Sequence, residues 1–237
     1  MRPLFYFWST IMIVIKEVLT AQQIDHFNHV MAKQEWVDGS VTGGSQSNTV
    51  KKNQQLPADS AIVRGLEDTV LAALAKHPMF ISAALPLKIF PPMFNRYGIG
   101  ETYGVHVDNA IRIPPGSSAR IRTDLSATLF LTEPDQYDGG ELVIEDHYGS
   151  QPVKLAAGDL ILYPSTTLHQ VTPITRGERT CAVFWVQSMV RNTEYRKILF
   201  DLDQTVQSLT SQHGHEHHDV MRLSGIYHNL IRQWTDT

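Results

Sequence analysis

Apolar side chains recur at helical spacing in two segments near the start of the chain. Residues 19–36 contain Thr20, a favourable N-cap residue, followed by an apolar side chain every three or four positions. Residues 59–78 show the same period and end at Pro78, which we expect to stop the helix. The polar, Gly- and Ser-rich residues 41–57 between them are typical of a loop. This part of the chain therefore predicts two amphipathic helices joined by a long loop.

The pattern changes between residues 85 and 188, where short apolar runs alternate with turn residues. No helical pattern lies between these runs, which argues against alternating strand–helix–strand units. Evenly spaced short strands instead favour an antiparallel barrel or sandwich of the jelly-roll kind. The expected strands lie within residues 85–98, 103–111, 124–132, 139–146, 151–164, 168–174 and 179–188.

Helical spacing returns in residues 192–212 and 219–236. The predicted fold is therefore mainly β with flanking helices, and the helices that follow the β core form a separate segment. We expect four parts along the chain: an N-terminal extension (1–11), a strand and helices that pack on the core (12–84), the β core (85–190) and a C-terminal helical segment (191–237).

The composition is that of an ordinary globular protein and gives no sign of a nucleic-acid partner. The 237 residues are 42% hydrophobic and 19% charged, and the formal net charge is −4. A negative net charge gives no electrostatic reason to expect binding to nucleic acid or to an anionic membrane. The single cysteine, Cys181, cannot form an internal disulfide, which fits a reducing compartment.

The apolar run at the N-terminus resembles the core of a signal peptide but lacks its other features. The run ends at Lys16-Glu17 without a small-residue cleavage pattern, and it is too short to span a bilayer. We interpret residues 12–20 as a first strand, with Met12 as a natural start and residues 1–11 as an extension. The expected location of the protein is the cytoplasm.

Two metal-competent side chains occupy positions i and i+2 of a predicted strand. His106 and Asp108 there point to the same face, so the imidazole and the carboxylate converge on one point. On the inward face of a small barrel such groups cost free energy unless they are paired or bound to metal. This pattern alone leaves two interpretations open: a His–Asp hydrogen bond at a strand end, or part of a metal site.

His169 is the candidate for a third ligand because it lies in a distant predicted strand. Two histidines and one carboxylate form a facial triad that leaves three coordination positions open, the arrangement of non-haem Fe(II) oxygenases. The preceding histidine, His147, lies in a charged turn where we expect a solvated side chain. Without the other residues, His169 could equally be interpreted as a structural histidine of the core or of a turn.

Arg179 opens an otherwise apolar predicted strand, ten residues after His169. Its planar fork suits bidentate binding of a carboxylate, although the neighbouring Glu178 is an alternative partner. In a single hairpin closing at Arg176-Gly177, Arg179 would lie about 16 Å from His169 along the strand, at roughly 3.3 Å per residue. One small ligand contacts both residues only if the turn carries the chain to a second sheet. A shared pocket therefore requires a two-sheet architecture.

Four stretches together resemble the bacterial PKHD-type hydroxylases, close relatives of the prolyl and lysyl hydroxylase branch of the Fe(II)/2-oxoglutarate dioxygenases. The resemblance extends over nearly the whole chain from about Met12. The set of HxD, a later histidine and an arginine ten residues on is much more specific than any of its parts. The stretches are NRYGIGETYGVHVDNAIR, GGELVIED, GDLILYPSTTLHQVTPITRGERTCAVFWVQS and LSGIYHNLIRQW.

The resemblance implies a double-stranded β-helix (jelly-roll) core and a hydroxylase that releases succinate and CO₂. It implies that His106, Asp108 and His169 hold Fe(II), and that Arg179 binds the distal carboxylate of 2-oxoglutarate. Tyr97 matches, less specifically, the tyrosine that lines the cosubstrate pocket of prolyl hydroxylases. The family further implies O₂ as the second cosubstrate, L-ascorbate as the reductant that keeps the iron ferrous, and a link to iron uptake or homeostasis.

Two other functions stay open on the sequence. The first is a non-catalytic sensor of iron or 2-oxoglutarate that acts through a protein partner, and the second is a cupin-like dioxygenase with another cosubstrate. The full set of four residues favours the enzyme over the sensor, and Arg179 at its spacing argues against the cupin-like protein. For the enzyme we expect a small molecule or a peptide as substrate, no nucleic acid or membrane partner, and leave a homo-oligomer open.

Two further stretches are predicted to be solvated surface. His213, His215, His217 and His218 match no closed zinc site, and we expect them in a linker between helices, with adventitious metal binding as the alternative. The residues around Lys51 and Lys52 are expected to form a mobile surface loop, with the border of a substrate entrance as the alternative.

Overall fold

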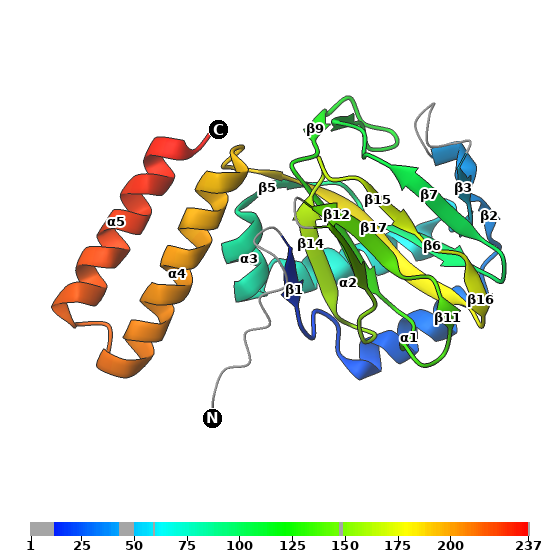
Figure 1. Ribbon diagram of the computed structural model, residues 1–237, viewed down its shortest axis with the longest axis horizontal. Helices are drawn as coiled ribbons and strands as arrows, with labels where there is room; N and C mark the ends of the chain where they lie inside the picture. Colours follow the sequence, from blue (N-terminus) through cyan, green and yellow to red (C-terminus); the bar gives the residue numbers. More distant parts are fainter. Residues whose placement is uncertain (1–11, 43–49, 59, 147–148, 237) are drawn as a thin grey trace.

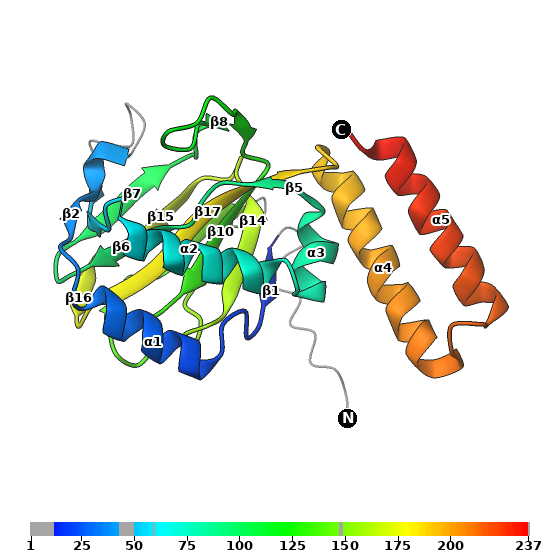
Figure 2. The same cartoon turned by 180° about the vertical axis from the view of Figure 1, so that it is seen from behind.

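The computed structural model describes residues 12–42, 50–58, 60–146 and 149–236 (Figure 1). Two antiparallel sheets face each other and form a jelly-roll core, which confirms the predicted fold class. The first two helices cover the outer face of the larger sheet, and the last two form a hairpin beside the core (Figure 2). The expectations for the N-terminal extension and for His147 lie outside the described residues.

The larger sheet has eight strands and the smaller facing sheet has five. The larger runs β1 (Ile13–Ile15), β14 (Leu160–Pro164), β10 (Leu125–Phe130), β17 (Arg179–Ser188), β6 (Met93–Tyr97), β4 (Gln54–Gln55) and β2 (Val37–Asp38), with β5 (Pro86–Ile89) also on β17. The smaller runs β13 (Gly149–Val153), β12 (Leu142–Asp146), β15 (His169–Val171), β7 (Thr102–His106) and β3 (Lys51–Lys52). Two short ribbons complete the core, β11 (Asp138–Gly139) with β16 (Ile174–Arg176) and β8 (Ile111–Arg112) with β9 (Ile121–Arg122).

Strand β10 is buried along its whole length because both of its faces are covered. On one face the larger sheet packs against the helices, where Phe27 meets Phe94 edge-on with ring centroids 5.9 Å apart. On the other face it packs against the smaller sheet, in a second apolar cluster that includes Phe130 and Ile144. The two clusters hold the sheets in a fixed relation, so side chains between them are rigidly placed.

The two N-terminal helices are α1 (Ala21–Met31) and α2 (Ala61–Leu74), as the apolar period predicted. The second helix ends before Pro78, as expected, and Pro78 begins a third helix, α3 (Pro78–Ala84). Proline suits the first helical position, where its missing N–H has no helical partner to lose. The long predicted loop is also partly wrong, since it contains β3 and β4.

Thr20 caps α1 as expected and forms a capping box with Gln23. The Gln23 N–H donates to Thr20 Oγ1 at 3.3 Å, and the Thr20 N–H donates to Gln23 Oε1 at 2.9 Å. We expect Thr20→Ala to lower the free energy of unfolding by about 1 kcal/mol, because orphan backbone donors lose their acceptor. Urea unfolding measures this loss. The exposed Gln22→Ala on the same turn is the control, and an equal effect of both variants would contradict the capping role.

The C-terminal hairpin consists of α4 (Thr193–His213) and α5 (His218–Trp234). It joins the core through a small cluster of Leu85, Val190 and Leu199 and through a hydrogen bond of 2.5 Å from Ser82 Oγ to Asp203. Among the described residues, no helix combines the length and the apolar character needed to cross a membrane.

The histidine cluster lies where the two helices of this hairpin meet, as predicted, although the helices extend further into it than expected. His213 ends α4, His217 caps α5 by accepting a hydrogen bond from the Asp219 N–H, and His218 begins α5. All four histidines are exposed. Within the described part of the chain, these histidines do not form a group of three side chains close enough to hold a metal ion.

Candidate metal centre and cosubstrate pocket

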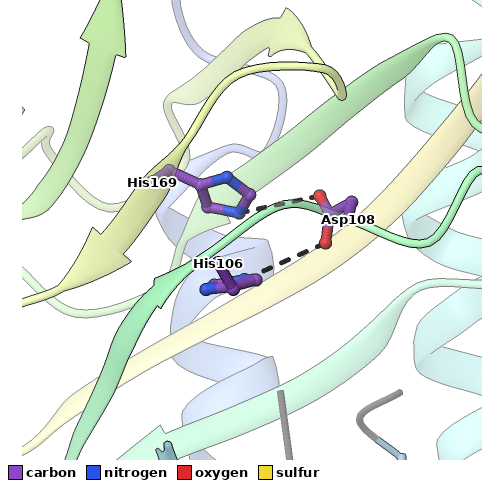
Figure 3. Close-up of side chains that lie close together, drawn as sticks. All are labelled: His106, Asp108 and His169. Atoms are coloured by element: carbon purple, nitrogen blue, oxygen red, sulfur yellow. Dashed lines mark ion pairs between the residues drawn. The ribbon is translucent and has the colours of Figure 1, made fainter. Parts of the chain in front are cut away.

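Three metal-competent side chains meet between the two sheets (Figure 3). His106 ends β7 and His169 begins β15, and the two residues are direct cross-strand partners. Asp108 lies two residues beyond the end of β7, so the strand ends earlier than the sequence suggested. The Asp108 carboxylate lies near both imidazoles, so the predicted convergence of the two side chains is present.

The distances suit one small cation bound by three protein atoms. His169 Nε2 lies 3.6 Å from Asp108 Oδ2, and His106 Nε2 lies 4.0 Å from Asp108 Oδ1. One ligand atom from each residue can be chosen so that all lie within 4.8 Å of one another. Metal–ligand bonds of about 2 Å fit such a spread. The group is one carboxylate and two imidazoles, the donor set that leaves positions open for other ligands.

Backbone carbonyls orient both imidazoles. The carbonyl of Gly104 accepts a hydrogen bond of 2.8 Å from His106 Nδ1, and that of Thr167 accepts one of 3.0 Å from His169 Nδ1. A proton on each Nδ1 leaves the Nε2 lone pair directed at the centre. Burial and then the neighbouring His169 lower the pKa of His106 to about 4. The His106 ring is therefore neutral at neutral pH, the form that binds metal.

Ser126, supported by Ser165, fixes the carboxylate, and no motif in the sequence points to either serine. Ser126 Oγ donates to Asp108 Oδ2 at 2.6 Å, and a bond of 2.8 Å joins the hydroxyls of Ser126 and Ser165. Ser126 is a small hydroxyl residue in the mainly apolar strand β10, and it gains a role only because the fold places it beside Asp108. Tyr103 is another unpredicted neighbour, because its ring stacks on His106 at 3.6 Å.

Arg179 enters the same cavity from the opposite sheet. The chain leaves β15 in the smaller sheet, passes through β16 in a separate ribbon, and begins β17 in the larger sheet. This route confirms the two-sheet requirement for a shared pocket. Glu178, the alternative partner, lies 3.6 Å from Arg96 instead.

The Arg179 side chain is buried but incompletely satisfied. It is 1% exposed, and its Nε has no hydrogen-bond partner within the described part of the chain. Its Nη1 donates to the Cys181 sulfur, a weak acceptor, at 3.0 Å. The guanidinium lies 5.3 Å from the ring centres of both Tyr97 and Phe130. Burying a cation whose N–H donor has no acceptor costs free energy, so this position favours an anionic ligand. A carboxylate suits it because its two oxygens match the guanidinium fork.

Tyr97 lies directly opposite Arg179 in the β6–β17 register and is buried in the cavity wall. Burial raises the pKa of its phenol far above the ordinary value, so Tyr97 remains a neutral hydrogen-bonding group. This position next to the guanidinium is where a residue would contact a ligand held by Arg179.

Gly140 makes room for the Arg179 side chain. Its φ is +65°, and a Cβ atom there would lie 2.3 Å from Ile174 Cδ1 and 3.1 Å from Arg179 Cδ. Only glycine combines that backbone conformation with so close an approach. Gly140 lies between β11 and β12 and shapes the arginine pocket.

Lys51 is a cavity residue, which the sequence treated as the less favoured of two alternatives. It is 7% exposed and belongs to β3, which pairs with β7 opposite Tyr103. Burial, and next the nearby Arg112 guanidinium, lower the pKa of Lys51 to about 8. The loop prediction failed because the segment is polar, whereas the strand is fixed by pairing with β7.

Family comparisons agree with this arrangement. A family model described as the 2OG-Fe(II) oxygenase superfamily matches residues 92–187, the segment that contains all the cavity residues discussed above except Lys51. A second model, described as the PKHD-type hydroxylase C-terminal domain, matches residues 194–236, which form the helical hairpin.

Curated relatives match over almost the full length. A PKHD-type hydroxylase of Rhizorhabdus wittichii is 54% identical over 225 residues, covering 95% of this chain and 99% of that protein. A PKHD-type hydroxylase of Acinetobacter baumannii is 55% identical over 222 residues, covering 94% of this chain and 98% of that protein. Among solved structures, a prolyl-4-hydroxylase of Pseudomonas putida has 20% identity and a TM-score of 0.51, covering 75% of this chain and 92% of that chain. This last likeness concerns the fold.

Proposed function

Because this chain belongs to the PKHD-type hydroxylases of the 2OG-Fe(II) oxygenase superfamily, we propose that it hydroxylates a substrate at the His106–Asp108–His169 centre. As a 2-oxoglutarate-dependent dioxygenase it uses Fe(II), 2-oxoglutarate and O₂, and forms succinate and CO₂. The observation that carries the residue assignment is one cavity lined by the three metal-competent side chains and by the buried Arg179.

Each residue has a distinct task in this proposal. His106, Asp108 and His169 hold Fe(II), which supplies the activation of O₂ once it is bound. Arg179 binds the distal carboxylate of 2-oxoglutarate and so sets the length of cosubstrate that fits. Tyr97 and Phe130 flank the guanidinium and exclude water from it, which strengthens the charge pairing. Ser126 keeps the Asp108 carboxylate in its ligand orientation.

We further propose a reductant, a substrate class, a physiological role and a location for the reaction. L-Ascorbate serves as the reductant that returns the iron to the ferrous state. The substrate is a small molecule or a peptide, the reaction supports iron uptake or homeostasis, and it takes place in the cytoplasm. The single cysteine fits that reducing compartment.

Turnover distinguishes this enzyme from a non-catalytic sensor. The Fe(II)-loaded protein with 2-oxoglutarate and O₂ is expected to form succinate, and a true substrate is expected to raise the rate and to gain the mass of one oxygen atom. Succinate assay and mass spectrometry of a metabolite and peptide panel measure the two products. Tight binding of both Fe(II) and 2-oxoglutarate without succinate under any condition would contradict the enzyme and favour the sensor.

A further inference from the structure

The cavity wall beside Arg179 carries a buried amide, that of Asn95. Asn95 lies two residues before Tyr97 on β6, so the two side chains share one face of the strand, and both line the cavity. Each of them is 2% exposed. A buried polar side chain costs free energy unless its hydrogen-bonding groups find partners. The partners of the Asn95 amide therefore indicate what this part of the wall binds.

The strand register places Asn95 next to the Arg179 guanidinium. Asn95 is directly opposite Cys181 on β17, and the neighbouring pair on the same face is Tyr97 with Arg179. Directly opposite side chains on one face of a sheet have Cβ atoms about 5 Å apart. The Arg179 side chain extends toward this pair, because its Nη1 donates to the Cys181 sulfur at 3.0 Å. An anion bound by the guanidinium is therefore within reach of the Asn95 amide.

The carbonyl half of the Asn95 amide already has a partner. Asn53 Nδ2 donates to Asn95 Oδ1 at 3.2 Å, and Asn53 is itself 4% exposed. This hydrogen bond occupies the carbonyl oxygen of Asn95 and directs its NH₂ group away from Asn53. Within the described part of the chain, that NH₂ group has no hydrogen-bond acceptor. Asn95 thus presents unused N–H donors at the wall of a cavity, beside a buried cation.

Asn53 is held firmly in the position from which it reaches Asn95. It directly precedes β4, the strand that pairs with β6, and its backbone carbonyl accepts a hydrogen bond of 2.9 Å from the Gly39 N–H. A Cβ atom at position 39 would lie 2.1 Å from Asn53 Oδ1, so only glycine leaves room for this side chain. Burial raises the pKa of the Tyr97 phenol, and a contact with Asn53 partly opposes that rise. Asn53 therefore braces both polar side chains of β6 that face the cavity.

The wall has donors without acceptors, which a carboxylate supplies. The Asn95 NH₂ group and Arg179 Nε both lack an acceptor among the described residues. A carboxylate has about four lone-pair positions, and a bidentate arginine occupies two of them. An amide N–H beside the fork can fill a third position. Because the amide is neutral, it adds this hydrogen bond without placing a second positive charge next to the guanidinium.

We propose that Asn95 is a further cosubstrate-binding residue, which donates a hydrogen bond to the distal carboxylate of 2-oxoglutarate beside Arg179, and that Asn53 is its positioning residue. This inference rests on the proposed function and adds how the site selects its cosubstrate. Arg179 supplies the charge, and Asn95 supplies a neutral donor with a fixed direction. A 2-oxo acid without the distal carboxylate engages neither of them.

Paired affinities for two 2-oxo acids test the contact. The protein is loaded with Zn(II) in place of iron; calorimetry measures 2-oxoglutarate, and ligand-observed NMR measures 2-oxobutyrate, a monocarboxylate. Asn95→Ala is expected to weaken 2-oxoglutarate binding by about tenfold, because a hydrogen bond to a charged group is lost. The affinity for 2-oxobutyrate is expected to change by less than about twofold, since a general disturbance of the pocket would weaken both ligands.

A second variant changes the charge and keeps the shape. Asn95→Asp retains the side-chain volume and an acceptor for Asn53, but it places a carboxylate beside the distal carboxylate of the ligand. We expect a larger loss of 2-oxoglutarate binding than in Asn95→Ala, and again little change for 2-oxobutyrate. Zn(II) binding at wild-type affinity shows that the site is intact in both variants. The exposed Asn28→Ala on α1 is the control and is expected to bind both ligands like wild type.

A double-mutant cycle tests the positioning role of Asn53. Asn53→Ala alone is expected to weaken 2-oxoglutarate binding by about fivefold and to leave 2-oxobutyrate binding unchanged. In the Asn95→Ala background the same substitution is expected to have no further effect, because the amide that Asn53 orients is already absent. Equal losses in both backgrounds would show that Asn53 does not act through Asn95 and would contradict its positioning role.

The outcomes separate this inference from the proposed function. Wild-type affinity for 2-oxoglutarate in both Asn95 variants, or an equal loss for the two 2-oxo acids, would overturn the contact. A crystal structure of the Zn(II) complex with 2-oxoglutarate is expected to place Asn95 Nδ2 within about 3.2 Å of the distal carboxylate, and an amide turned away from the ligand would overturn it as well. Failure of the wild-type protein to bind 2-oxoglutarate at all would instead refute the proposed function.

Discussion

His169→Ala is expected to weaken Fe(II) binding by more than about 100-fold. Residues that merely orient ligands typically contribute 10- to 100-fold to metal affinity, and loss of a direct ligand exceeds that. The remaining His106 and Asp108 provide two protein ligands on one side of the ion, which cannot hold it against water. Anaerobic titration with Fe(II), followed by calorimetry or by competition with a chelator, measures the change.

Two matched variants make this result specific. His26→Ala removes an exposed histidine from α1 and is expected to leave Fe(II) affinity unchanged. Ser126→Ala keeps all three ligands but removes the hydrogen bond to Asp108, and a loss of about tenfold is expected. If His169→Ala retained wild-type affinity for Fe(II), the metal would have to bind elsewhere, and the residue assignment would be wrong.

The sequence predicted the β core and its candidate ligands because each rests on local pattern. Alternating apolar runs identified the strands on both walls, and the HxD pair was visible as two residues two positions apart. The strand itself is shorter than predicted, because β7 ends at His106 and Asp108 reaches the two imidazoles from the segment that follows it.

The cavity residues that the sequence analysis did not identify were missed for a different reason. Lys51 belongs to a polar segment whose strand is created by pairing with β7, and Ser126 is one hydroxyl in an apolar strand. Arg112 becomes notable only when the fold stacks it on Trp185. In each case the side chain acquires its role from a partner distant in sequence, so local propensity cannot find it.

In the segment from His169 to Arg179, the connection between the sheets decides whether two residues ten positions apart can reach one cavity. In one flat hairpin the two side chains would be too far apart for a single small ligand. The chain instead crosses from the smaller to the larger sheet through β16, and both residues line one cavity. The spacing therefore reflects the distance between two facing walls, with the metal-competent residues on one and a buried guanidinium on the other.

Arg179→Ala is expected to weaken 2-oxoglutarate binding by about 100-fold, or roughly 2.7 kcal/mol. The guanidinium is buried and its Nε is unsatisfied, so a carboxylate placed there gains a charge-assisted hydrogen bond that water does not replace. Calorimetry on the Zn(II)-loaded protein measures the affinity. Arg176→Ala is the matched control, since Arg176 lies on the same turn but pairs with Asp138 at the surface.

A cosubstrate without the distal carboxylate tests the same contact from the ligand's side. Wild-type protein is expected to prefer 2-oxoglutarate over the monocarboxylate 2-oxobutyrate by about 100-fold, and Arg179→Ala is expected to lose most of that preference. Fe(II) affinity without cosubstrate should stay unchanged, because Arg179 lies on the wall opposite the ligands. If Arg179→Ala bound 2-oxoglutarate as tightly as wild type, the distal carboxylate would lie elsewhere. Lys51 and Arg112 are the other cations among the described residues of the cavity lining, so one of them would then be the candidate for binding that carboxylate.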